Sequence, residues 1–146
     1  MSGLEVASAV VGILAIGGKM VAYLWDVSHK FADAPDSVLA ALIALKETSL
    51  ILEESQLYIL QMYPVPENRR LLILIEHISD TLTGCVLTHS DLEKQIDFAK
   101  DTGSAEDEYT FDREKWLARE KQVQDAVRRL QDHKSSFALM LNILQW

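Results

Sequence analysis

The 146-residue chain is poor in cysteine, proline and glycine, with one, three and six of these residues respectively. A single cysteine excludes an internal disulfide and any metal site built from several cysteines. A chain of this length buries roughly two thirds of its unfolded surface on folding, so it needs neither a disulfide nor a metal ion for stability. Hydrophobic residues make up 49% of the sequence and charged residues 25%, which is typical of a globular domain. The composition predicts one domain over residues 1–146.

Sequence motifs of catalysis are also missing. The chain contains no G-x-x-x-x-G-K-[ST] phosphate loop and no G-x-S-x-G, H-E-x-x-H or C-x-x-C pattern. Cys85 and His89 are four residues apart and would share a helix face as half of a zinc site. Zinc requires three or four ligands, so a structural role in an apolar seam is the favoured interpretation. We therefore expect no enzyme, no catalytic residue, no cofactor and no metal site.

The charge is predominantly acidic. The chain has 14 basic and 22 acidic residues, for a net charge of −8. Duplex nucleic acid requires a dense cationic face, so nucleic acid is not expected as a partner. The stretch 101–111 contains four acids and no cation, and Gly103 lies within it, which predicts an acidic loop.

The remaining segments show helical periodicity, and no run alternates with period two. Pro35, Pro64 and Pro66 divide the chain, because proline favours the first position of a helix and ends the helix before it. The pattern predicts an all-α fold, an antiparallel bundle of four long helices with short connections. The predicted helices are 3–33, 36–63, 66–100 and 112–144, with the acidic loop over 101–111.

Apolar residues form regular stripes along the last three helices. The final helix repeats every seven residues at Trp116, Val123, Leu130, Phe137 and Leu144. The second helix has two stripes about 140° apart, which predicts that it is contacted from two sides. The first stripe comprises Val38, Leu45, Leu52 and Ile59, and the second comprises Ile43, Leu50 and Leu57. Glu120 and Lys134 interrupt the final stripe, and we favour partial burial there over a polar contact that fixes the register or is released on activation.

The first helix is different, because the thirteen residues from Val6 to Gly18 carry no charge. Val6–Trp25 is twenty residues long, enough to span a bilayer. Its aliphatic residues favour insertion by about 0.3 to 0.6 kcal/mol each, and Lys19 opposes it by up to about 3 kcal/mol, so the sum lies near zero. Such a helix suits either a protein core or lipid, and the Gly17–Gly18 pair is where it could break. Glu5 precedes the apolar run, which disfavours a signal peptide.

Three stretches together carry a family resemblance. They are the opening MSGLEVASAVVGILAIGGKMVAYLWDV, the second-helix segment APDSVLAALIALKETSLILEES, and the final KWLAREKQVQDAVRRLQDHKSSFALMLNIL. In this order and spacing they resemble the fungal N-terminal domain of STAND proteins, in the HeLo-like group of cell-death effector domains. The loop 101–111 does not contribute to the resemblance.

The resemblance implies a non-enzymatic effector of programmed cell death, heterokaryon incompatibility and innate immunity at the front of a fungal NLR-like receptor. A nucleotide-binding oligomerisation domain would follow it in the full-length protein. The expected partners are further copies of the chain and the phospholipid membrane. The domain would be cytoplasmic at rest and would reach the plasma membrane on activation, when oligomerisation releases the first helix to permeabilise it.

By position, the resemblance places the membrane element at Gly3 to Trp25. We expect glycines within this element to permit close packing or rearrangement, and Glu5 to line a pore. The glycines are Gly12, Gly17 and Gly18, and the residues expected to contact lipid are Val6, Val10, Ile13, Leu14 and Leu24. The alternative is a protein-interaction adaptor with the first helix permanently in the core. Such an adaptor would recruit partners or form a homodimer through the apolar seam of the last helix.

Overall fold

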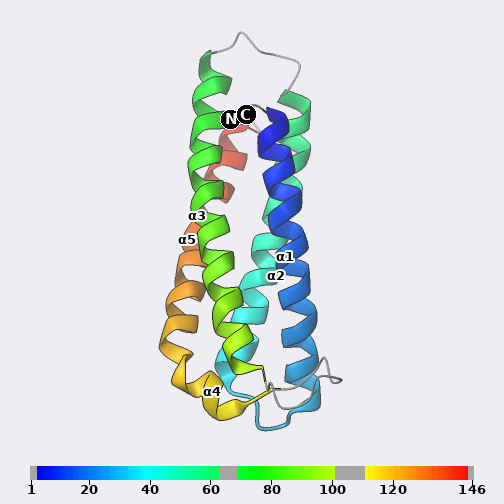
Figure 1. The fold of residues 1–146 in the computed structure, drawn as a ribbon. Coiled ribbons are helices and arrows are strands. Elements are labelled where there is room, and N and C mark those ends of the chain that lie inside the picture. Colours follow the sequence, from blue (N-terminus) through cyan, green and yellow to red (C-terminus); the bar gives the residue numbers. More distant parts are fainter. Residues whose placement is uncertain (1–2, 63–68, 101–110, 145–146) are drawn as a thin grey trace.

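The structure is a computed structural model that describes residues 3–62, 69–100 and 111–144; the side chains at 3–4, 58–62, 69–75 and 144 are not described. These residues form five helices and no strand, which confirms the all-helical prediction (Figure 1). The helices are α1 (Gly3–Lys30), α2 (Asp36–Met62), α3 (Arg69–Ala99), α4 (Arg113–Ala118) and α5 (Glu120–Leu144).

The long helices α1, α2, α3 and α5 lie lengthwise beside one another, and the short α4 lies at one end of the bundle (Figure 1). Helix α1 packs against α2 and α3, and α5 packs against the same two helices. Each long helix therefore contacts two long neighbours, and the apolar faces of all four meet in a shared interior.

Two of the predicted helices differ from the observed ones. Helix α1 ends at Lys30 and runs without a break through Gly17 and Gly18. The expected final helix is interrupted at Arg119, whose φ of −110° and ψ of 8° lie outside the helical range and end α4. The Asp112 carboxylate caps the start of α4 by accepting hydrogen bonds from the backbone N–H groups of residues 114 and 115, at 3.0 and 3.2 Å. The short α4 is thus a separate element before α5.

Other boundaries agree with the proline signals. Helix α2 begins at Asp36, directly after Pro35. The backbone N–H of Val38 donates a 3.0 Å hydrogen bond to the Pro35 carbonyl, as expected for a proline in the first turn. The predicted loop over 101–111 lies outside the described residues except for Phe111, as do residues 63–68 around the other two prolines.

The core consists of two clusters along the bundle, and α1 contributes to both. The cluster nearer α4 surrounds Trp116 and includes Leu24 and Leu45. The other cluster surrounds Phe137 and includes Val10 and Leu52. Burying an aliphatic or aromatic side chain contributes about 1.5–3 kcal/mol, so α1 supplies a substantial part of the hydrophobic stabilisation.

The predicted stripes have two different outcomes. The α5 seam is buried inside the bundle, and its residues with described side chains are at most 1% exposed: Trp116 in α4, and Val123, Leu130 and Phe137 in α5. The homodimer contact that the adaptor alternative expects through this seam would therefore need these residues to leave the core, and it stays a prediction. The second α2 stripe is uncovered, with Ile43, Leu50 and Leu57 exposed by 47%, 66% and 63%. The described chain contacts α2 through its first stripe and leaves the second at the surface.

Candidate functional site: the first helix and its docking surface

Four of the five predicted lipid-contacting residues of α1 lie inside the bundle. Val6, Val10, Ile13 and Leu24 are at most 2% exposed, and Leu14 is partly buried against the Phe137 cluster. In this conformation the apolar face of α1 therefore contacts protein. Lipid contact requires α1 to leave its position or its neighbours to separate.

The opposite face of α1 is exposed and nearly uncharged. Among the described residues, one helix, from Glu5 to Lys30, is long and apolar enough to cross a membrane by length and composition, and 39% of its apolar stretch is buried. The outward residues between Glu5 and Trp25 are small or apolar apart from Lys19: Ser8, Val11, Gly12, Ala15, Gly18 and Ala22. Glu5 is exposed at the start of α1, and its pore-lining role stays a prediction.

The three glycines of α1 have different surroundings. A Cβ atom added at Gly12 or at Gly18 would meet nothing within 4 Å. A Cβ atom at Gly17 would lie 3.5 Å from Nε2 of His89 and 3.5 Å from Oγ of Ser49. Close packing in this state therefore occurs at Gly17 alone, and the glycines at 12 and 18 are not required for the packing of α1.

Replacing Gly12 or Gly18 by alanine is expected to stabilise the bundle by about 0.5–1 kcal/mol each, because alanine is the better helix former and its methyl group meets open space. Urea denaturation of the single and double variants measures this gain. A loss of stability at either position would show that the glycine has a structural role in the docked state.

A buried histidine faces α1 at Gly17. His89 is 1% exposed, and its Nδ1 lies 2.9 Å from the Cys85 carbonyl oxygen. Because a carbonyl only accepts, Nδ1–H is the donor, and the neutral ring presents Nε2 as an acceptor. Nε2 makes no hydrogen bond within the described part of the chain. A buried acceptor without a partner costs roughly 1–3 kcal/mol, so this position weakens the contact between α1 and α3.

Burial keeps the histidine–cysteine pair neutral. Burial lowers the pKa of His89, an effect opposed by its bond to the Cys85 carbonyl and reinforced by the nearby His133. Burial also raises the pKa of the Cys85 thiol to about 12. No group of three or more histidine, cysteine or acidic residues suited to a metal occurs in the described ranges. The pair lies in the seam of α3, as its heptad position predicts.

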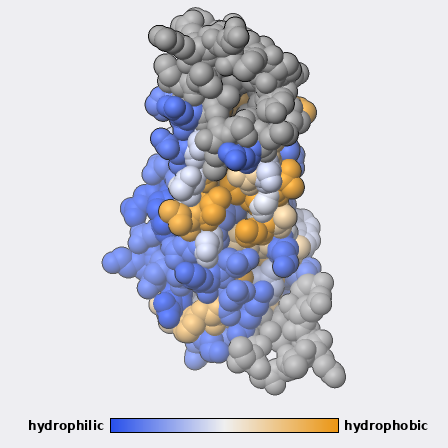
Figure 2. Space-filling model, turned by 45° about the horizontal axis from the view of Figure 1, so that its top comes forward, coloured by the Kyte–Doolittle hydropathy of each residue, from blue (hydrophilic) through white to orange (hydrophobic). Residues whose placement is uncertain are grey.

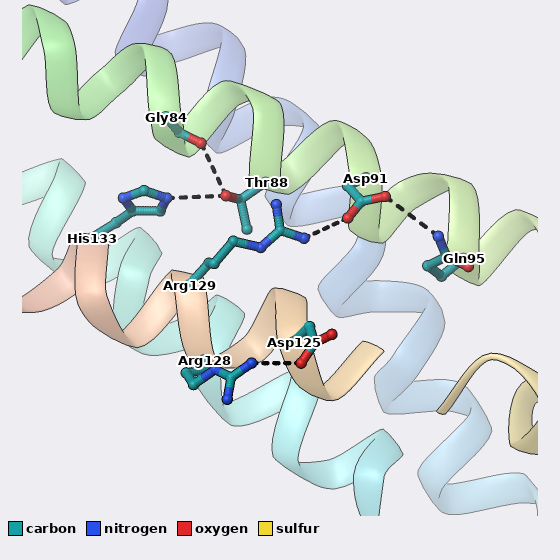
Figure 3. Close-up of polar contacts among 8 residues, drawn as sticks. All are labelled: Gly84, Thr88, Asp91, Gln95, Asp125, Arg128, Arg129 and His133. Atoms are coloured by element: carbon teal, nitrogen blue, oxygen red, sulfur yellow. Dashed lines mark hydrogen bonds and ion pairs between the residues drawn. The ribbon is translucent and has the colours of Figure 1, made fainter. Parts of the chain in front are cut away.

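Polar contacts connect α3 to α5 on a different side from the α1 contact (Figure 3). The Thr88 hydroxyl donates to the Gly84 carbonyl at 2.9 Å and lies 3.0 Å from Nε2 of His133. Arg129 forms an ion pair with Asp91 at 2.5 Å. These contacts join α3 and α5 independently of α1.

The polar residues of the final stripe bind α2. Glu120 accepts a 2.7 Å hydrogen bond from the Ser37 hydroxyl, and Lys134 forms a 2.5 Å ion pair with Glu47. Both side chains are partly buried, as the interrupted stripe predicts, and both also make a polar contact, as the alternative interpretation requires. Sequence reasoning missed their partners, and it missed the contact between His89 and Gly17. In the sequence, that contact is signalled by Gly17, a glycine within an apolar helix.

Comparison with protein-family models, curated proteins and solved structures finds no match to this chain. The resemblance to HeLo-like domains therefore depends on the three quoted sequence stretches.

Proposed function

We propose that this chain is a non-enzymatic effector domain of cell death and innate immunity, whose helix α1 is released on oligomerisation to engage and permeabilise membrane. In this proposal α1, α2, α3 and α5 form an antiparallel four-helix bundle at rest, with α4 as a short extension. The domain precedes a nucleotide-binding oligomerisation domain in a fungal NLR-like (STAND) receptor. It is cytoplasmic before activation and at the plasma membrane afterwards, and it uses no cofactor.

The observation that carries the proposal is the division of α1 into two faces. Its inner face is apolar and contacts the core, whereas its outer face is small, apolar and nearly free of charge. The outer face of a permanently soluble helix normally carries charged residues. Helix α1 therefore meets the requirement of a membrane helix, an apolar perimeter, while it is still docked.

The balance of energies explains why release would require clustering. Leaving the bundle exposes the buried residues of α1 and opens both core clusters, which is unfavourable for a single copy. Lipid contact would compensate part of this, since each Val, Ile or Leu favours insertion by about 0.3–0.6 kcal/mol. Clustering by a fused domain raises the local concentration of released helices, so a minor conformation becomes populated.

A charge on the outer face of α1 tests the proposal without disturbing the bundle. Val11 is 55% exposed, so Val11→Glu is expected to leave the free energy of unfolding within about 0.5 kcal/mol of wild type. In a bilayer a central acidic side chain opposes insertion by roughly 2.5–3.5 kcal/mol. With the chain tethered densely to dye-loaded vesicles, we expect wild type to release dye and Val11→Glu to lose most of this leakage.

The matched control is Leu87→Glu on α3, where the side chain is 64% exposed and outside the proposed membrane element. Vesicles that carry this variant should release as much dye as vesicles that carry wild type. Equal leakage by the Val11 and Leu87 variants would contradict the release of α1. Deleting residues 1–25 is less informative, because that deletion removes α1 residues from both core clusters and the remaining chain is expected to lose its packing.

The uncovered stripe on α2 favours the adaptor function as a second candidate. An adaptor keeps α1 in the core permanently and presents α2 to a partner. It predicts no vesicle leakage from the wild-type chain, with binding lost on substitution of the α2 stripe.

A further inference from the structure

The outer face of α2 is the longest uncovered apolar stripe that the described residues contain. Leu39, Ile43, Leu50 and Leu57 are each exposed by 47–66% and recur along a single helix. Figure 2 shows that hydrophobic residues also gather among hydrophilic ones on one face of the molecule. Monomeric proteins rarely expose extended apolar patches, which mark interaction surfaces.

Leu50 is the ridge between two hollows. The hollow toward α1 has a volume of about 330 Å³ and is lined by Leu14, Gly18 and Lys46, among others. The hollow toward α5 has a volume of about 400 Å³ and is lined by Glu54 and Lys134, among others. Leu50 lines both hollows and is 66% exposed. A protruding leucine beside a hollow whose lining includes a glycine suits knobs-into-holes packing with another helix.

The charges beside the stripe indicate which helix fits. Lys46 and Glu53 both line the hollow toward α1, on the same edge of the stripe and on opposite sides of Leu50 along the helix. An antiparallel copy of α2, related by a two-fold axis at Leu50, would place its Glu53 beside Lys46 and its Lys46 beside Glu53. The same symmetry would set Ile43 against Leu57 of the second copy and Leu50 against itself.

On the other edge of the stripe, Glu47 of each copy would approach Glu54 of the other copy. Glu47 is already paired with Lys134, which reduces the repulsion on this edge. A parallel pair would instead bring Glu53 of one copy beside Glu54 of the other and would use Glu47 as the partner of Lys46. Both arrangements contain two Lys–Glu and two Glu–Glu approaches, and the antiparallel one is favoured because its Glu–Glu approaches involve Glu47, whose charge Lys134 already offsets.

We propose that the outer face of α2 is a self-association surface that binds a second copy of this chain in an antiparallel, two-fold arrangement centred on Leu50. The surface is isologous, so each copy supplies both the leucine ridge and the hollow that receives it. This inference rests on the exposed α2 face and does not require α1 to enter a membrane.

Sedimentation velocity over a range of concentrations tests the proposal. We expect a monomer–dimer equilibrium whose association constant falls at least about tenfold in Leu50→Glu and is unchanged in Leu87→Glu, which is 64% exposed on α3. Lys46→Glu should also weaken association, and the swap Lys46→Glu with Glu53→Lys should restore it. Circular dichroism checks that each variant stays folded, as expected for exposed positions.

Cysteine cross-linking tests the register. Leu50→Cys should form a disulfide-linked dimer, and Ile43→Cys mixed with Leu57→Cys should form a mixed dimer, while Ile43→Cys alone should not. The native Cys85 is buried and is not expected to compete.

A chain that remains monomeric, or association unaffected by Leu50→Glu, overturns the proposal. Leu50-dependent binding of a monomeric chain to phosphatidylcholine vesicles would assign the face to lipid and also overturn it. The Val11→Glu leakage test is independent of each of these results.

Discussion

Replacing Trp116 by alanine is expected to lower the free energy of unfolding by about 3–5 kcal/mol, among the largest effects of any single substitution in this chain. Trp116 is completely buried and lies in the core cluster nearer α4. Its removal leaves a large cavity where α1, α2, α3 and α5 meet, and the surrounding helices can close it only in part.

The tryptophan also organises a polar chain between distant segments. Its indole Nε1–H donates to the Ser37 hydroxyl at 2.8 Å, and Ser37 in turn donates to Glu120 at 2.7 Å. Trp116→Phe keeps an aromatic ring but loses the indole donor. It should destabilise less than Trp116→Ala, with about 0.5–1.5 kcal/mol of its loss due to the missing hydrogen bond.

Leu117→Ala is the control, because Leu117 is the next residue, is 39% exposed and lies on the outer side of α4. It should change stability by about 0.5 kcal/mol or less. Denaturant titrations of the three variants give the comparison directly. A Trp116→Ala variant as stable as Leu117→Ala would mean that α4 is not anchored to the core through this residue.

The burial of Trp116 illustrates what the sequence can predict. A seven-residue apolar repeat identifies the inward face of a helix from local spacing alone, and Val123, Leu130 and Phe137 are buried as that repeat predicts. Likewise, Pro35 marks the start of α2 through its own backbone restriction. Such features depend on residues close together in the chain, so no knowledge of the partner helices is needed.

The features that were missed depend on distant partners. The hydrogen bond from Trp116 to Ser37 joins positions 79 residues apart, and the break at Arg119 interrupts a pattern that is continuous in sequence. Gly17 stands out in the sequence as a glycine within an apolar helix, but its contact with His89 forms only when α1 and α3 pack together. The second stripe of α2 was correctly identified as apolar, yet the sequence does not show that the chain leaves it uncovered.

Acidification is expected to destabilise the bundle through the buried His89 and the partly buried His133. Burial lowers the pKa of His89 and also that of His133, where Arg129 acts in the same direction and Asp132 opposes it. Since these folded-state pKa values lie below the ordinary value of about 6.5, the unfolded chain binds protons first as the pH falls. Their effect on stability is therefore absent well above pH 6.5, and stability declines below it, by up to about 1.4 kcal/mol per pH unit for His89 and by less for His133, which solvent screens more strongly.

The effect should concentrate at the contact between α1 and α3, because the unpaired Nε2 of His89 lies against Gly17. His89→Leu removes both the titrating group and the unpaired acceptor, so it should reduce the dependence of unfolding free energy on pH below 6.5 and leave the smaller part due to His133. Hydrogen exchange, corrected for intrinsic rates, should show less protection of α1 at pH 5 than at pH 7.5 in wild type, and a smaller loss of protection in His89→Leu. If both proteins lose protection equally, protonation acts elsewhere and His89 does not govern the docking of α1.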